Sequence, residues 1–182
     1  MKVLIMLFLL SPFIYSINCD KHPIYCQMKK LLPNRNASDT MALSNLFHKY
    51  ARKYGQDPLL SVAIARQETG LREINRRQNI IKFFDKCDKT GCYEDYEIVR
   101  GYTDICLFQF HVDTIVHEKL NPVRLKNDID YCVEQHFKLL KKKRRLCKHL
   151  GEDSWTCYHS KSKKLREFYK SLVMEYYDDD TE

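Results

Sequence analysis

Eight cysteines, at positions 19, 26, 87, 92, 106, 132, 147 and 157, constrain the fold of this 182-residue chain more than any other feature. All of them follow an apolar leader, "MKVLIMLFLLSPFIYS", which has the layout of a secretory signal peptide. An even number of cysteines in an exported chain indicates disulfide bonds. The sequence has no Cys-x-x-Cys pair and no His-Glu-x-x-His segment, so disulfides are favoured over a metal site, and no cofactor is expected.

The leader itself predicts export. Its uninterrupted apolar run, residues 3–10, is too short to span a bilayer. We interpret residues 1–16 as a signal peptide that is cleaved near Ser16, which makes the mature protein periplasmic or secreted. Two alternatives are an uncleaved anchor and lipid attachment at Cys19, although Asn18 before that cysteine makes a poor lipid-attachment signal.

One pair of cysteines can be assigned from sequence. β-Branched and aromatic residues lie on both sides of "CDKTGC", and Asp88 to Gly91 form a turn signal between them. This pattern predicts a short β-hairpin whose tip is closed by a disulfide between Cys87 and Cys92. The other six cysteines cannot be paired from the sequence.

Elsewhere, apolar residues at helical spacing alternate with capping residues and predict a mainly helical chain. The expected helix starts are Ser38, Asp57-Pro58, Asp113, Asn127 or Asp128, Asp153 and Ser162, and three helices are expected to end at or near Gly55, Gly70 and Gly151. The hydrophobic fraction of 44% suits a single core. We therefore expect an irregular arm over 17–37, one domain over 38–177 and an acidic tail over 178–182, in a monomer.

The net charge of +7 is compatible with binding to an anionic polymer such as the cell wall. The densest basic run, "KKKRR" at 141–145, is interpreted as a solvated helix face. No segment has the interleaved aromatic residues of a nucleic-acid-binding module, so no nucleic-acid partner is expected.

Glu68 is the main candidate for a catalytic residue. It shares one helix stripe with Leu60 and Ile64, at the end of the helix that Gly70 stops. Apolar neighbours and the negative end of the helix dipole both disfavour the charged carboxylate. Both effects are expected to raise the pKa of Glu68 above the reference value of about 4.3, as a general acid near neutral pH requires.

Three segments, "YGQDPLLSVAIARQETG", "GYTDICLFQF" and "WTCYHSKSKKLREFYKSLV", together resemble the lytic transglycosylases of the lysozyme-like superfamily. The resemblance covers about residues 40–176 and is closest to small exported members associated with secretion and conjugation machines. It implies a mainly α, lysozyme-like single domain with a small β-hairpin after the catalytic helix, stapled here by disulfides. It also implies peptidoglycan glycan strands as substrate and an envelope-spanning secretion or conjugation assembly as a partner.

The resemblance assigns roles to individual residues. Glu68 matches the catalytic acid/base, Gln109 the glutamine that lines the sugar groove, and Tyr158 the tyrosine near the acid. Thr69 stands next to Glu68 where many members have Ser, and it is assigned to substrate binding. Asp104 is the one residue in these motifs that can act as a second catalytic carboxylate. It too is assigned to the substrate groove.

Two departures from the family pattern concern the groove. Cys106, in "DICLFQF", occupies a position where many members have Gly, so its side chain alters the groove unless a disulfide draws it aside. The glycine of the family's "YN.G" segment is absent from "CYHS". His111, His136 and His159 are interpreted as structural or exposed.

The implied activity is cleavage of the MurNAc–GlcNAc bond of peptidoglycan with formation of 1,6-anhydro products. Glu68 would protonate the bond and then take the proton from the C6 hydroxyl of muramic acid. Two alternatives stay open: a lysozyme-type muramidase that hydrolyses the bond with Asp104 as second carboxylate, and an inactive wall-binding or adaptor protein on the same scaffold.

Overall fold

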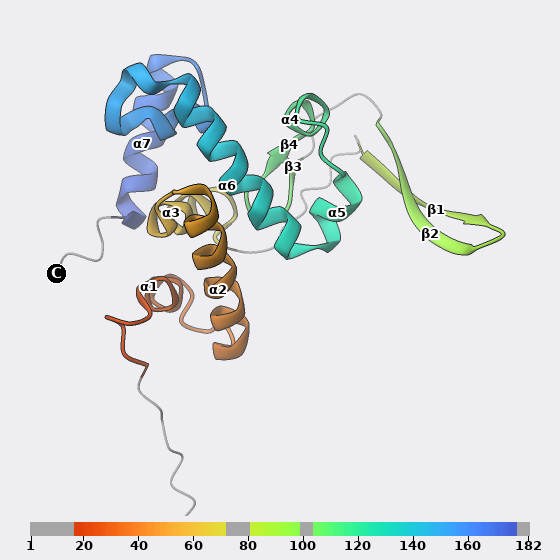
Figure 1. Cartoon of the computed structure of the whole chain (residues 1–182), viewed down its shortest axis with the longest axis horizontal. Helices are drawn as coiled ribbons and strands as arrows, with labels where there is room; N and C mark the ends of the chain where they lie inside the picture. Colours follow the sequence, from red (N-terminus) through yellow and green to blue (C-terminus); the bar gives the residue numbers. More distant parts are fainter. Residues whose placement is uncertain (1–16, 72–80, 99–103, 178–182) are drawn as a thin grey trace, which may run out of the picture.

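The computed structural model describes residues 17–71, 81–98 and 104–177. The proposed signal peptide, its cleavage site and the acidic tail lie outside the described residues. The described chain is mainly helical with one projecting hairpin (Figure 1). Its elements are α1 (Pro23–Leu31), α2 (Ala37–Tyr54), α3 (Pro58–Thr69), β1 (Ile81–Asp88), β2 (Gly91–Ile98), β3 (Asp104–Ile105), β4 (Phe110–His111), α4 (Val112–His117), α5 (Pro122–Asn127), α6 (Ile129–Leu146), the 3₁₀ segment η1 (Lys148–Tyr158) and α7 (Lys163–Tyr177).

α3 is the central helix of the body. It packs against α1, α2 and α7, and the residues from Leu60 to Ala65 are all buried. The helix begins as the sequence predicts, because the Asp57 side chain accepts the backbone N–H of Leu59 at 2.8 Å. It ends at Gly70, which adopts the left-handed conformation (φ 67°) and donates its N–H to the Arg66 carbonyl at 2.8 Å.

The hydrophobic core lies between α2, α3, α6 and the short β3–β4 unit. Phe47 from α2 contacts Phe108 and Phe137, with ring centroids 5.7 and 5.8 Å apart. All three side chains are essentially inaccessible to solvent. This packing brings the 104–111 segment against α6. Among the described residues, no helix is both long and apolar enough to cross a membrane.

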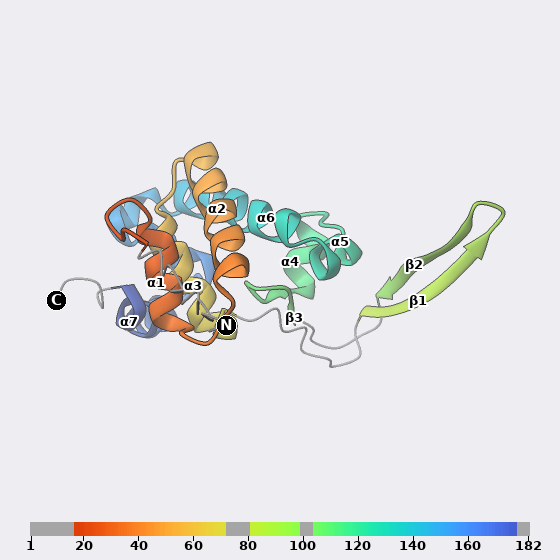
Figure 2. The same ribbon diagram turned by 90° about the horizontal axis from the view of Figure 1, so that it is seen from below.

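β1 and β2 form the predicted hairpin, with Cys87 directly opposite Cys92 in the antiparallel register. The hairpin projects away from the helical body in both views (Figures 1 and 2). A contact with α5 holds it: Glu94 forms a 2.5 Å ion pair with Lys126 and accepts a hydrogen bond from Asn127 at 3.0 Å.

All eight cysteines are paired, which confirms the expected disulfide framework. The bonds are Cys19–Cys26, Cys87–Cys92, Cys106–Cys132 and Cys147–Cys157. The tip of the hairpin is therefore closed as predicted. The bond of Cys19 to Cys26 argues against lipid attachment at Cys19, because the thiol that would carry the lipid is engaged.

The N-terminal arm, 17–37, is not irregular as expected. It contains α1, whose Pro23 occupies the first turn and whose Ile24 and Met28 are buried in the core. The apolar residues of this short stretch thus recur at helical spacing. The helix was not predicted because the prolines and cysteines in the stretch suggested an irregular segment. The next helix is capped by Asn36, whose side chain accepts the N–H of Ser38, so Ser38 is not the cap.

Three other helix boundaries differ from expectation. α4 is capped by His111, whose Nδ1 accepts the N–H of Asp113 at 3.3 Å, whereas Asp113 was the predicted cap. α6 begins at the predicted cap Asp128 but ends at Leu146, before Gly151. The disulfide of Cys147 to Cys157 closes the following segment into the 3₁₀ turns of η1. Asp153, the expected start of a helix, lies inside η1, which begins at Lys148.

Candidate active site

A cavity of about 290 Å³ opens where the end of α3, the β3–β4 unit and the end of η1 meet. Its lining residues are Glu68, Asp104, Phe108, Gln109, Phe110, His111, Thr114, Leu139, Tyr158 and His159. Four of the five predicted active-site residues are among them. The structure therefore brings together residues from three segments that are far apart in the sequence.

Glu68 lies in the last turn of α3 and is half-buried. The hydroxyl of Tyr169 donates a hydrogen bond of 2.6 Å to its Oε1 atom. Tyr169 comes from α7, packs against α3 and is only 3% exposed. This bond fixes the orientation of the Glu68 carboxyl group at the cavity wall.

The two phenols next to Glu68 remain protonated over the physiological pH range. Burial raises the pKa of Tyr158 well above its usual range, and the negative charge of Glu68 raises it further. The pKa of Tyr169 is also raised well above its usual range, by burial first and then by the charge and hydrogen bond of Glu68. Both tyrosines can therefore act as hydrogen-bond donors beside the carboxyl group.

The tight turn between β3 and β4 forms another part of the cavity lining. Cys106 (φ 67°) and Gln109 (φ 48°) both adopt the left-handed conformation that favours glycine. The N–H of Gln109 donates to the Cys106 carbonyl at 3.1 Å and closes the turn. The cysteine thus keeps a glycine-like backbone.

The disulfide to Cys132 holds the side chain of Cys106 against α6, within the hydrophobic core. Neither cysteine lines the cavity. Of the two possibilities raised by the sequence, the structure favours the one in which a disulfide draws the side chain aside from the groove.

Thr69 has a different place from the one expected. It is buried, it is not among the lining residues, and its hydroxyl lies 2.9 Å from the Leu107 carbonyl and 3.1 Å from the Ala65 carbonyl. It thus connects the end of α3 to the β3–β4 turn beneath the cavity. Thr69 therefore does not line the cavity to which the sequence assigned it, and its hydroxyl is directed to backbone carbonyls instead.

An aromatic stack supports the floor of the cavity. His136 from α6 is fully buried and stacks on Phe108, with ring centroids 3.6 Å apart. The rings of His136 and Tyr158 form an edge-to-face contact, with centroids 5.1 Å apart. Burial lowers the pKa of His136 well below its usual value, so the ring is neutral. This histidine is structural, as interpreted from the sequence.

His159 and His111, in contrast, both line the cavity. His159 stacks on Tyr169 with centroids 4.1 Å apart, and desolvation lowers its pKa. The sequence interpretation missed this placement, and it did not single out Tyr169. The available signal was chemical: a tyrosine on a buried stripe requires a partner for its hydroxyl.

Chemically, the cavity offers two carboxyl groups, phenolic and imidazole groups, and the Gln109 amide. Within the described ranges, no three His, Cys, Asp or Glu side chains are grouped as a metal site would require. The arrangement suits general acid–base chemistry on a polar, oxygen-rich substrate. Comparison of the chain with protein-family models, curated proteins and solved structures finds no match.

Proposed function

We propose that this protein is an exported, lysozyme-like lytic transglycosylase that cleaves the MurNAc–GlcNAc bond of peptidoglycan. The observation that carries the proposal is the convergence of Glu68, Gln109 and Tyr158 on one cavity. These residues come from the three segments that resemble the family, and all three line the same cavity. Their convergence was not imposed by proximity in the sequence.

In the proposed mechanism, Glu68 serves first as acid and then as base. It donates a proton to the glycosidic oxygen of the leaving sugar. It then accepts the proton of the C6 hydroxyl of muramic acid as that oxygen attacks C1, which gives a 1,6-anhydro product. The Tyr169 hydroxyl orients the carboxyl group for both steps, and Gln109 and Tyr158 contact the sugars.

Hydrolysis is the second candidate, and one observation favours it. Asp104 lines the same cavity as Glu68. A second carboxylate is what a hydrolytic glycosidase uses to activate water or to form a covalent intermediate. Transglycosylation does not need this group, because the substrate supplies its own nucleophile.

The four disulfides support an oxidising compartment, in agreement with the leader sequence. We place the protein in the periplasm or outside the cell. An enzyme of this type opens local gaps in the wall, which suits a role beside an envelope-spanning secretion or conjugation assembly.

Digestion of purified peptidoglycan tests the proposal directly. We expect mass spectrometry of the soluble products to show 1,6-anhydro muropeptides, which are lighter by one water than hydrolysis products. Reducing-end products alone would establish the hydrolase, with Asp104→Asn then expected to abolish activity. If the protein binds the wall but releases nothing, the adaptor alternative replaces the enzyme.

A further inference from the structure

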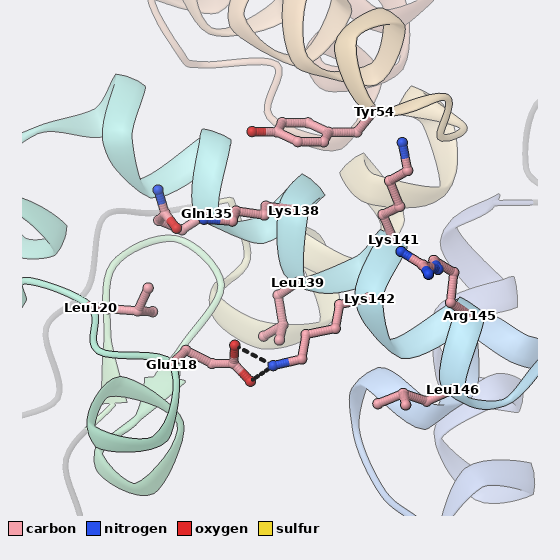
Figure 3. Close-up of a pocket in the computed structure, with 10 residues that line it drawn as sticks. All are labelled: Tyr54, Glu118, Leu120, Gln135, Lys138, Leu139, Lys141, Lys142, Arg145 and Leu146. Atoms are coloured by element: carbon pink, nitrogen blue, oxygen red, sulfur yellow. Dashed lines mark hydrogen bonds and ion pairs between the residues drawn. The ribbon is translucent and has the colours of Figure 1, made fainter.

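A second and larger cavity, of about 550 Å³, lies along the outer face of α6 (Figure 3). It is bounded by Tyr54 at the end of α2 and by Glu118 and Leu120 after α4. The lining residues are Tyr54, Glu118, Leu120, Gln135, Lys138, Leu139, Lys141, Lys142, Arg145 and Leu146. We call this cavity the α6 groove.

The α6 groove is strongly basic. Lys138, Lys141, Lys142 and Arg145 lie three and four residues apart, so they share one helix face. Glu118 is the single carboxylate in the lining, and both of its oxygens contact the Lys142 amino group, at 2.8 and 2.7 Å. In the part of the chain that the structure describes, the other three cations form no ion pair, so their mutual repulsion is relieved only by solvent or by an anionic ligand.

The floor of the α6 groove is apolar. Leu139 and Leu120 point into the space between Glu118 and the basic side chains (Figure 3). Leu146 lines the same space and is 68% exposed, which is high for a leucine beside a cavity. A matching ligand therefore combines several negative charges with small aliphatic groups, whereas a purely ionic polymer leaves Leu146 uncovered.

The α6 groove adjoins the Glu68 cavity. Leu139 lines both. On the facing side, Thr114 of α4 lines the Glu68 cavity, and Glu118, four residues later, lines the α6 groove. The two cavities are therefore neighbours, and one is lined by two carboxyl groups and the other by four cations. A ligand that fills both needs a part without negative charge at Glu68 and an anionic arm at α6.

We propose that the α6 groove binds the carboxylates of the peptide stem that the glycan strand carries. The inference rests on the proposed function, because the stem is attached to the muramic acid whose bond is cleaved. Stems combine free carboxylates with small aliphatic side chains, which is the combination that the groove offers. Lys138 and Arg145 bind the carboxylates, and Leu139 contacts the aliphatic groups.

Equilibrium binding tests the groove without depending on cleavage. The probe is a fluorescent GlcNAc–MurNAc peptide, which lacks the MurNAc–GlcNAc bond, and its matched form has amidated carboxylates. The double variant Lys138→Gln, Arg145→Gln should bind the free-acid probe roughly four- to tenfold more weakly than wild type, as expected for two exposed ion pairs. The amidated probe should bind equally weakly to both proteins.

The control variant Lys161→Gln, Lys164→Gln removes the same charge from exposed lysines that line neither cavity. It should bind both probes as wild type does. Equal affinity of the Lys138, Arg145 variant and wild type for the free-acid probe would overturn the inference. So would an equal loss in the control variant, which would indicate a general charge effect.

Cleavage kinetics separate this inference from the proposed function. The Lys138, Arg145 variant should lose kcat/KM on stem-bearing strands and keep it on strands whose stems an amidase has removed. An equal loss on both strands would overturn the stem assignment and place the cations on the glycan itself. If wild type cleaves neither strand, the proposed function fails, and the probe-binding result still decides whether the α6 groove binds the stem.

Discussion

The Glu68 cavity and the β1–β2 hairpin are assembled in opposite ways. The hairpin is made from one continuous segment, and its disulfide joins cysteines only 5 residues apart. The cavity wall depends on distant pairs: Cys106 bonds to Cys132 over 26 residues, and Tyr169 reaches Glu68 over 101. Local damage to the hairpin should therefore stay local, whereas loss of a single long-range contact should affect the whole site.

The largest effect is expected from Glu68→Gln. The amide keeps the shape of the side chain but cannot deliver a proton, and loss of general acid–base help costs ~10²- to 10⁴-fold in rate. The loss should reach the upper end because one group serves as both acid and base. Release of muropeptides measures it, with circular dichroism to show an intact fold. Glu152→Gln, at an exposed position outside the cavity, is the matched control, and near-normal activity of Glu68→Gln would refute the site.

Next in size is the loss of the Cys106–Cys132 bond. The chain-entropy model gives about 3.5 kcal/mol for a loop of this length, against about 2 kcal/mol for the hairpin bond. Urea unfolding of Cys106→Ala, Cys132→Ala and of Cys87→Ala, Cys92→Ala measures both. Only the first pair should also lower activity, because only it holds a cavity wall. Equal losses of stability and activity in the two variants would break the comparison between the regions.

Tyr169→Phe should lower kcat roughly tenfold with little change in KM, since a hydrogen bond to a charged group contributes about 1.5–3 kcal/mol. The variant keeps the ring that packs in the core and removes only the donor to Glu68. Tyr177→Phe is the matched control, because it removes a 2.7 Å bond from the same helix to Asp57, at the other end of α3. If both variants lose the same activity, the Tyr169 hydroxyl acts through helix packing alone.

A smaller effect concerns the pH dependence of stability. Burial lowers the pKa of His136 well below its usual 6.5, so as the pH falls through 6.5 only the unfolded chain gains this proton. The contribution to stability is present above pH 6.5 and lost below it. By pH 5.5 the wild type should therefore have lost stability to urea that His136→Phe keeps. Urea melts at pH 7.5 and 5.5 measure the difference; parallel losses in both proteins would assign acid sensitivity to other groups.

The smallest expected effect tests the backbone of the β3–β4 turn. Cys106 adopts φ 67°, where a side chain costs about 1 kcal/mol and glycine costs none. The variant Cys106→Gly, Cys132→Ala should therefore be more stable to urea than Cys106→Ala, Cys132→Ala by about that amount. The opposite order would mean that the turn changes conformation once the disulfide is removed.

The difference between local and long-range assembly also explains which features could be predicted from the sequence. The Cys87–Cys92 bond followed from a turn signal between adjacent strands, and the caps Asp57 and Asp128 followed from local capping chemistry. Residues 104 and 158 were assigned to the site through their motifs, and both line it. These features are local, or are written in short segments that resemble a known pattern.

The remaining features depend on packing between distant segments. The partner of Cys106 could not be chosen because the register of α6 against the β3–β4 turn is a property of the core. Thr69 was placed in the groove, but its hydroxyl is directed to the Leu107 carbonyl by that same packing. Nothing in the local sequence singles out Tyr169. Its role appears only when α7 lies against α3.

α7 fastens α3 at both ends, through Tyr169 to Glu68 and through Tyr177 to Asp57. These two contacts affect the order in which the site is assembled as the chain is synthesised. Glu68 leaves the ribosome long before Tyr169 does, so the carboxyl group is oriented only when α7 has emerged and docked. In the exported enzyme that we propose, this timing would withhold full activity during synthesis and translocation, and the docking of α7 would be the step that completes the active site.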